Sequence, residues 1–316
     1  MISTLVNGVV QKPSIVDAII KQGVATAPLI EMLSSGTLTA PKHSWLNDRY
    51  EDAKDNAHLE LSDLDENIAP TKTKTENISQ ILKKDIGVTR RQMSMSQYGG
   101  KEWEYQVAKK GKEHLKDIEF ALLGLGHVGG VFSAPVAGTA TKAPRMGGLF
   151  YFVPNEQRQD FSSDKDGDNT TGILTDFSMD TLHSFLEPLW LRGAMEDDTF
   201  TVLLGSKLKQ SVNRVCADYL VKDGSGKADG TFNPTIQKIE TDFGTVKFRL
   251  HRQFAGDALA DKMLAGKFNE ARIMYIERTS FGELPTTKTA KYGRYYSDLS
   301  LEVKNGDMFA SAEGLK

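Results

Sequence analysis

The stretch between Glu102 and Leu123 carries the clearest periodic pattern in the chain. Residues of one stripe recur there at steps of three and four: Trp103, Val107, Gly111, His114, Leu115, Ile118 and Leu122. Lysine, glutamate and aspartate fill the positions between them, so one side of a helix would be apolar and the other charged. The pattern predicts a long amphipathic helix, and Gly124 is a typical residue to end it.

Shorter patterns surround this helix. Ser178 is placed to cap a helix that would bury Leu182, Phe185, Leu186, Leu189 and Trp190, and Ser206 to cap another. Alternating or apolar runs predict strands at 39–47, 85–97, 200–204, 236–241, 245–251, 271–276 and 293–304. In the last strand the odd-numbered residues Tyr295, Leu299, Leu301 and Val303 would share one face. Helices and strands in this mixed order predict the α+β class.

Residues 1–38 resemble an arm more than a domain. Pro13 and Gly23 bracket a short helical pattern from Ser14 to Gln22. The apolar residues of this region have too few partners nearby in sequence to bury them: Ile15, Ile19, Ile20, Leu29, Met32 and Leu33. We therefore expect the arm to dock on another surface.

A long polar segment joins the first two predicted strands, and its halves differ in charge. Residues 51–66 hold seven acidic residues against Lys54, whereas residues 71–91 hold six basic residues against Glu76 and Asp85. Such a hairpin can pair internally or with a neighbour's surface. A solvated loop is the alternative, although polar connectors of this length are uncommon in compact domains.

Composition narrows the classes of function. The chain has 316 residues, a formal net charge of −3 and no long basic tract, which argues against a DNA-binding protein. Cys216 is the one cysteine, so no intrachain disulfide is possible and a reducing compartment is indicated. The first ten residues carry no secretion signal. Residues 120–141 are uncharged, but five glycines and Pro135 argue against a membrane helix.

Gly124 to Gly129 spell G-x-G-x-x-G, the fingerprint of dinucleotide-binding proteins. A dinucleotide site requires these glycines before the N-terminus of a helix, so that amide groups face the pyrophosphate. Here they follow a helix. We expect them to end it, and an oxidoreductase built on this motif is the remote alternative.

Other tests for chemistry fail. The Gly-Lys pairs lack the flanking residues of a phosphate-binding loop, and the Asp164, Asp166, Asp168 series lacks the glycine and glutamate of a calcium loop. The histidines have no zinc spacing, and no nucleophile elbow is present. The sequence therefore predicts a protein that is not an enzyme, with no catalytic, cofactor-binding or metal-ligating residues.

Four stretches carry a family resemblance by their order and spacing. They are residues 25–33 with His43-Ser44-Trp45; residues 104–112 with 117–123; residues 145–149; and residues 289–293 with 301–305. Together with the order of arm, charged loop, long helix, α/β block and terminal strand, they resemble the major capsid proteins of tailed bacteriophages, which have the Hong Kong 97-type fold.

This resemblance implies a division of the chain and a function. It implies an N-terminal arm at 1–38, an extended loop at 39–98, a peripheral domain with its spine helix at 99–145, an axial domain at 146–275, and the peripheral return strand and C-terminus at 276–316. It also implies a structural protein whose pentamers and hexamers form an icosahedral virion shell in the host cytoplasm. Implied partners are scaffolding, portal and decoration proteins and packaged double-stranded DNA, bound without sequence specificity, but no membrane.

The physical interpretation agrees, because an apolar arm and a charged hairpin without a catalytic site are typical of a protein that neighbouring copies complete. Residues 177–270 are expected to pack around the rings. The residues expected at inter-subunit contacts are Ile15, Ile19, Leu29, Trp45, Lys83, Lys84, Arg90, Arg91, Trp103 and Gly111. An encapsulin-like nanocompartment, which resembles this fold but encloses enzymes in place of a genome, is the alternative within the same class.

Overall fold

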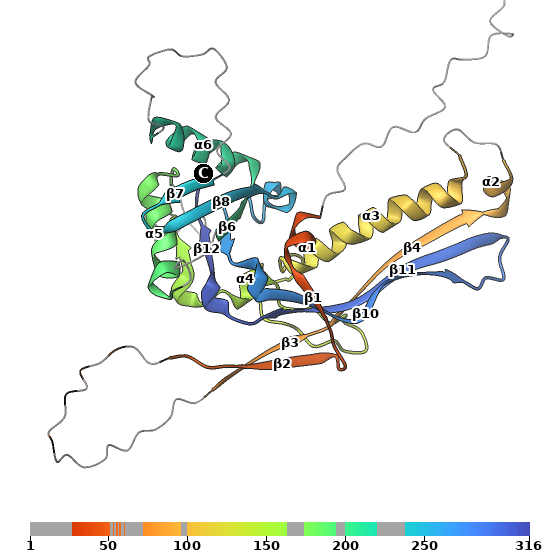
Figure 1. Cartoon of the computed structure of the whole chain (residues 1–316). Helices are drawn as coiled ribbons and strands as arrows, with labels where there is room; N and C mark the ends of the chain where they lie inside the picture. The colour runs from red at the N-terminus through yellow and green to blue at the C-terminus, as the bar shows by residue number, and fades with distance from the viewer. Residues whose placement is uncertain are drawn as a thin grey trace, which may run out of the picture.

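Two sheets of different shape organise the chain, and a hairpin projects from the place where they meet (Figure 1). The computed structural model describes residues 27–50, 53, 55, 57, 60, 72–95, 100–162, 174–193, 200–219 and 238–316. A six-stranded sheet forms a rounded lobe, and a four-stranded sheet forms an elongated lobe. Helices and sheets in this mixture confirm the predicted α+β class.

The strands of the rounded lobe come from the middle and the end of the chain. In spatial order they are β5 (Arg158–Asp160), β12 (Phe309–Glu313), β9 (Met263–Gly266), β6 (Phe200–Leu204), β8 (Gly244–Leu250) and β7 (Lys238–Thr241). Neighbours are antiparallel except that β6 runs parallel to β8 and β5 parallel to β12. Short 3₁₀ turns connect elements of both lobes, at Asn155–Gln157, Arg252–Ala255, Phe268–Glu270 and Gly306–Met308.

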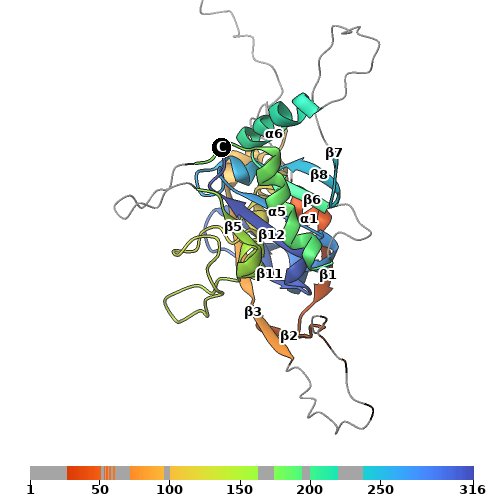
Figure 2. The same cartoon turned by 90° about the vertical axis from the view of Figure 1, so that its left-hand side faces the viewer.

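Helices cover both faces of this sheet. α5 (Met179–Leu191) and α6 (Ser206–Tyr219) pack on one face, with Val202 and Leu204 in their shared core, and α5 lies in front of the sheet in Figure 2. α1 (Pro28–Met32), α4 (Leu149–Phe152) and the end of the long helix pack on the other face, with Leu203 in that core. Both sides of β6 are buried, which explains its nearly continuous apolar sequence.

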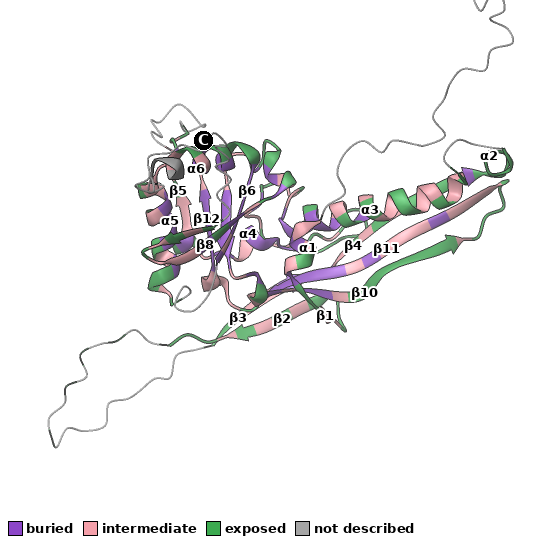
Figure 3. Ribbon diagram, turned by 45° about the horizontal axis from the view of Figure 1, so that its top comes forward, coloured by how far each residue is buried: buried purple, intermediate pink, exposed green. Residues whose placement is uncertain are grey.

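The elongated lobe is a twisted ribbon backed by one helix. Its strands lie in the order β1 (Ser34–Thr37), β10 (Ala271–Leu284), β11 (Ala290–Val303) and β4 (Gln80–Thr89). The long helix, α3 (Glu102–Leu122), lies along β4 and β11 and confirms the sequence prediction to within one residue. Leu299, Leu301 and Val303 are buried, as their shared parity in β11 predicts. The distal half of β10 is exposed (Figure 3).

The glycines after α3 end the helix, as predicted. Gly124 has φ +78°, its amide donates to the Ala121 carbonyl at 2.9 Å, and the Leu125 amide donates to the Phe120 carbonyl at 3.1 Å. These two bonds form a Schellman motif, which requires a left-handed residue at the position of Gly124. The glycines therefore lie at the carbonyl end of α3 and not at the amide end of a helix.

The hairpin consists of β2 (Lys42–Asn47) and β3 (Thr73–Ile78). The predicted strand at 39–47 is confirmed in its second part, and the predicted strand at 85–97 is confirmed only for residues 85–89, which belong to β4. β4 ends at Thr89, whose side chain accepts a hydrogen bond from the Gln92 amide at 3.3 Å and so caps the helix α2 (Arg90–Ser94). β4 pairs with β11, so it belongs to the elongated lobe and not to the hairpin.

Elements cross the domain boundaries proposed from the sequence. β4 lies within 39–98 but joins the sheet that α3 covers, and β10 begins at Ala271, inside the proposed axial domain. β12, within 276–316, joins the six-stranded sheet of the rounded lobe. Each lobe is thus built from segments distant in sequence, and the exact division into domains stays a proposal.

Candidate assembly surfaces

The inner face of the hairpin is fixed to the molecule by a buried carboxylate. Glu302 of β11 accepts hydrogen bonds from His43 Nε2 of β2 at 2.5 Å and from Arg272 Nε of β10 at 2.9 Å. Trp45 packs on Phe152 of α4 with ring centroids 5.6 Å apart. Since His43 and Trp45 share one parity of β2, these contacts determine which face of the hairpin is turned toward the molecule.

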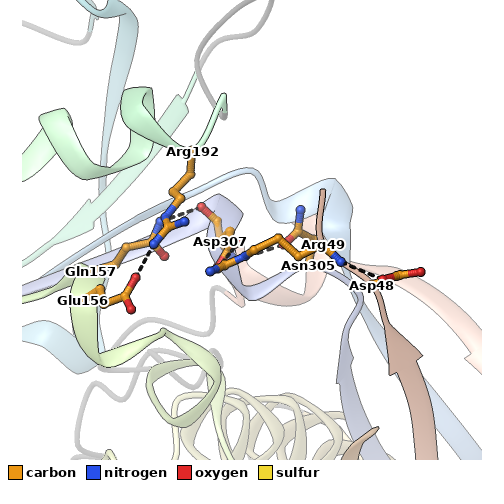
Figure 4. Close-up of polar contacts among 7 residues, drawn as sticks. All are labelled: Asp48, Arg49, Glu156, Gln157, Arg192, Asn305 and Asp307. Carbon is orange, nitrogen blue, oxygen red and sulfur yellow. Dashed lines mark hydrogen bonds and ion pairs between the residues drawn. The ribbon is translucent and has the colours of Figure 1, made fainter. Parts of the chain in front are cut away.

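The far end of the hairpin strands, where β2 continues into residues 48–50, is held by a second set of polar contacts (Figure 4). Arg49 Nη2 lies 2.5 Å from Asp307 Oδ2, and the Asp307 carbonyl accepts from Gln157 Nε2 at 2.8 Å. The Asp307 amide donates to Asn305 Oδ1 at 3.0 Å, which fixes the turn before β12. A cavity of about 420 Å³ lies beside this ion pair, with Asn47, Thr75, Phe152, Pro154 and Val303 among its lining residues.

The outer face of the hairpin is exposed and charged. Glu76 lies 2.5 Å from Lys42 Nζ and 2.6 Å from Lys74 Nζ. Hydrogen bonds from Lys42 and then Lys74 hold the pKa of the Glu76 carboxyl below its ordinary value. Leu46, beside Lys74 across the hairpin, is 65% exposed. This face therefore offers an apolar residue surrounded by charges whose mutual arrangement is already fixed.

Both edges of the hairpin are unpaired. In the part of the chain that the structure describes, β2 and β3 pair only with each other. Exposed strand edges present a row of amide and carbonyl groups that another chain can pair with, and an isolated two-stranded hairpin is marginally stable in water. The hairpin is thus typical of a segment that another surface completes.

Leu29 does not lie at an exposed contact. Its side chain is fully buried in the core between α1 and α3, so the prediction that it contacts a neighbouring subunit is wrong. Its amide donates to Glu119 Oε1 of α3 at 2.6 Å, and His251 Nε2 lies 3.4 Å from Glu119 Oε2. The buried Glu119 carboxylate therefore joins the arm, the long helix and the rounded lobe.

The predicted basic contact residues lie on the elongated lobe and not on the hairpin. Lys83 of β4 and Arg90 and Arg91 of α2 are exposed. Lys84 is half-buried and its Nζ lies 2.6 Å from Asp117 Oδ2 of α3. The sequence placed them on the charged hairpin, but β4 pairs with β11 and not with β2, so three of these four side chains are exposed basic residues of the elongated lobe.

Trp103 and Gly111 have partners within their own chain. Trp103 packs on Phe281 of β10, with ring centroids 6.2 Å apart, and the Lys291 ammonium lies 4.6 Å from the indole centroid. Gly111 faces the ring of Tyr295 in β11. Both are half-buried, so a contact of either with a neighbouring subunit stays a proposal. Ile15 and Ile19 lie outside the described residues.

A further exposed apolar surface was not predicted from the sequence. Trp190 and Leu191, at the end of α5, are 50% and 66% exposed, although the helical pattern places Trp190 on the buried stripe. The Trp190 indole packs on Phe243 in the turn between β7 and β8, with ring centroids 6.0 Å apart. The next residue, Arg192, forms an ion pair with Glu156 that fixes the end of α5 (Figure 4).

The described residues hold no candidate metal site. No group of three or more His, Cys, Asp or Glu side chains in these ranges could hold a metal ion. His114, on the buried side of α3, bonds Ser297 Oγ at 2.7 Å, and burial lowers the pKa of its imidazole. No described helix is long and apolar enough to cross a membrane.

Comparison with known proteins identifies this arrangement. The sequence profile of the SU10 major capsid protein family matches residues 3–316, nearly the whole chain. The chain belongs to this family. A stretch of 99 residues is 34% identical to the major capsid protein of Escherichia phage Phieco32, and this stretch covers 30% of the chain and 28% of that relative. The family assignment confirms the resemblance on which the fold and function were predicted.

Solved structures similar to this capsid protein share its fold across their full length. The capsid subunit of Cyanophage A-1(L) matches with a TM-score of 0.69 at 10% identity, covering 99% of each chain. The SrpI encapsulin of Synechococcus elongatus PCC 7942 matches with a TM-score of 0.57 at 11% identity, covering 100% of this chain and 96% of its own. The Hong Kong 97-type fold is thereby confirmed, and the family and fold are those of a structural protein.

Proposed function

We propose that this capsid protein assembles, through rings of five and six copies, into a closed icosahedral shell in the host cytoplasm, and that the shell encloses a double-stranded DNA genome without sequence-specific contacts. The observation that carries this proposal is the hairpin. Its inner face and the far end of β2 are anchored by Glu302 and Asp307, yet β2 and β3 pair with no other strand among the described residues and the outer face is largely exposed. A segment so firmly fixed and so little buried is suited to a contact with another copy.

The hairpin and the segment that it carries act in this proposal as a strap between subunits. Residues 51–66, most of which lie outside the described residues, have seven acidic side chains in their sequence. Lys83, Arg90 and Arg91 form an exposed basic surface on the elongated lobe. Complementary charges of this kind steer association and select the register of a contact. The acidic segment of one copy is therefore proposed to meet the basic surface of the next.

The protein is proposed to act without catalysis, in company with other virion proteins. The SU10 major capsid protein family supports a structural role. Scaffolding, portal and decoration proteins are proposed as further partners. The Gly124 to Gly129 turn supports no nucleotide site, since the carbonyl end of α3 disfavours anions.

An encapsulin-like nanocompartment is the second candidate, favoured by the structural likeness to the SrpI encapsulin. The contents of the shell separate the two functions. The protein should be expressed in bacteria, and sedimenting particles should be collected, treated with nuclease and analysed for nucleic acid and protein. In the presence of the phage's packaging proteins, nuclease-resistant DNA is expected. Particles that hold one co-purifying enzyme in place of DNA would favour the nanocompartment, and soluble monomers under all conditions would contradict both.

A further inference from the structure

We propose that the exposed end of α5 is one half of a head-to-tail contact between neighbouring subunits of a ring, and that the other half is a hollow on the opposite face of the same six-stranded sheet. This inference rests on the proposed assembly into rings. It adds which surfaces of the rounded lobe meet there.

The first half is a helix face without a partner. The exposed residues of α5 recur at helical spacing along one stripe: Asp180, Ser184, Glu187 and Leu191. Trp190 lies beside this stripe and is braced by Phe243, which limits its freedom before binding. A half-exposed tryptophan with a fixed ring is a typical anchor of protein–protein interfaces, because it buries a large area at little entropic cost.

The second half is a hollow of about 290 Å³ on the far side of the sheet. Its lining residues are Glu31, Met32, Thr201, Gly266, Lys267, Phe268 and Asn269. Thr201 alternates along β6 with Val202, which points into the α5 and α6 core, so the hollow and α5 lie on opposite faces. Phe200, next to Thr201 in β6, pairs with Val246 near the β7–β8 turn, where Trp190 of α5 packs on Phe243. The hollow and the end of α5 therefore lie toward the same end of the strands.

The charges of the two halves are complementary. Asp180 and Glu187 are exposed on α5 and form no ion pair within the described residues. On the face with the hollow, Lys247 of β8 is exposed and likewise forms no ion pair there, whereas Lys238, directly opposite it on β7, is paired with Glu240.

A second copy of this chain is the occupant that these observations favour. A surface and its complement on opposite sides of one lobe cannot meet within a subunit. Between subunits they form a heterologous contact, the type that generates closed rings when the rotation between copies closes. An anchor on one side and a hollow on the other therefore match what each member of a ring must present to its two neighbours.

Disulfide crosslinking tests the contact directly. Leu191→Cys and Asn269→Cys would be combined in a Cys216→Ser background, which removes the native thiol, and particles would be oxidised. A disulfide requires Cα atoms within about 7 Å, so only apposed faces can crosslink. We expect a reducible ladder of products that ends at five and six subunits, and no ladder from either single-cysteine variant. Particles that assemble normally and give no ladder would overturn this inference and leave the shell function intact.

Charge exchange gives a second, independent readout. Glu187→Lys should reduce the yield of sedimenting particles at least tenfold at low salt, and adding Lys247→Glu should restore it. Leu191→Asp should abolish particles, whereas Val128→Asp, at a fully exposed apolar residue in the loop after α3, should not. Circular dichroism must show that each variant is folded. Normal assembly of Leu191→Asp would contradict the inference, and a wild-type protein that forms no particles would remove the proposed function together with it.

Discussion

Tyr295 of β11 lies directly over Gly111 of α3. A Cβ atom added at Gly111 would lie 3.0 Å from the Tyr295 hydroxyl, and this hydroxyl donates to the Val107 carbonyl at 3.1 Å. The absence of a side chain at Gly111 therefore makes room for the Tyr295 ring against the long helix. A larger residue there crowds the tyrosine and its hydrogen bond.

We predict that Gly111→Ala lowers the free energy of unfolding by about 1 kcal/mol, because loss of the Tyr295 hydrogen bond and crowding outweigh the gain of about 1 kcal/mol in helix propensity. Gly111→Leu should cost more. In a Tyr295→Phe background no hydrogen bond can be lost and only the ring contact remains, with Cζ 3.1 Å from the added Cβ, so the same alanine should cost less. Thermal unfolding of the four proteins measures this cycle, and an alanine that stabilises the wild-type protein would show that the two elements can move apart.

The turn after α3 gives a prediction on the glycine motif. Gly124→Ala should destabilise strongly, because Gly124 has φ +78° and its added Cβ would lie 2.8 Å from the Val131 carbonyl oxygen. Gly130→Ala is the matched control, since Gly130 has φ +87° and nothing within 4 Å of the added Cβ. It should cost only the backbone strain of about 1–2 kcal/mol.

Calorimetry with NAD or ATP should detect no binding to the wild-type protein, and micromolar affinity lost in Gly126→Ala would overturn this assignment.

His114 gives a prediction on pH. Burial lowers its pKa in the folded protein below the ordinary value of 6.5, so the unfolded chain binds a proton that the folded chain does not. The stabilisation is fully present above about pH 6.5 and is lost as the pH falls, by up to about 1.4 kcal/mol per pH unit. His114→Gln should therefore flatten the acid side of a plot of unfolding free energy against pH. His183→Gln, on the partly exposed side of α5, is the control, and parallel profiles for wild type and His114→Gln would contradict the assignment.

The basic surface of the elongated lobe gives a prediction on assembly. Arg90→Glu combined with Arg91→Glu should reduce particle formation and leave thermal stability unchanged, because both side chains are exposed. Lys84→Glu should also lower the melting temperature, since it breaks the ion pair with Asp117. Lys142→Glu, on an exposed turn, serves as the control. If the double variant assembles at the wild-type yield, these arginines do not receive the strap.

The elements that sequence patterns predicted are those whose own residues determine their burial. The apolar stripe of α3 packs on one continuous surface, and alternate residues of β11 face one core. In both elements the apolar positions in the sequence therefore correspond directly to the buried residues of the structure. The strand β6 was recognisable for the same reason, because its apolar run is buried on both faces. The role of the glycines after α3 could be predicted because they follow the helix in the sequence.

What the sequence did not predict depends on partners far away along the chain. β3 has the polar sequence Thr-Lys-Thr-Glu-Asn-Ile, and only pairing with β2 makes it a strand. β4 pairs with a segment more than 200 residues later, which no local pattern reveals. Trp190 lies at the edge of the apolar stripe of α5, where a small rotation of the helix about its axis determines whether a side chain is buried or exposed. Leu29 was taken for an exposed anchor because Glu119, which binds its amide, lies 90 residues away.

Electron microscopy of the purified protein tests the central claim most directly. The account predicts closed shells with icosahedral symmetry, in which density for residues 51–66, carried by β2 and β3, reaches the elongated lobe of a neighbour and α5 faces the next subunit of the same ring. Shells in which residues 51–66 contact only their own subunit would contradict the strap. Monomers or small dimers under all assembly conditions would contradict the account as a whole.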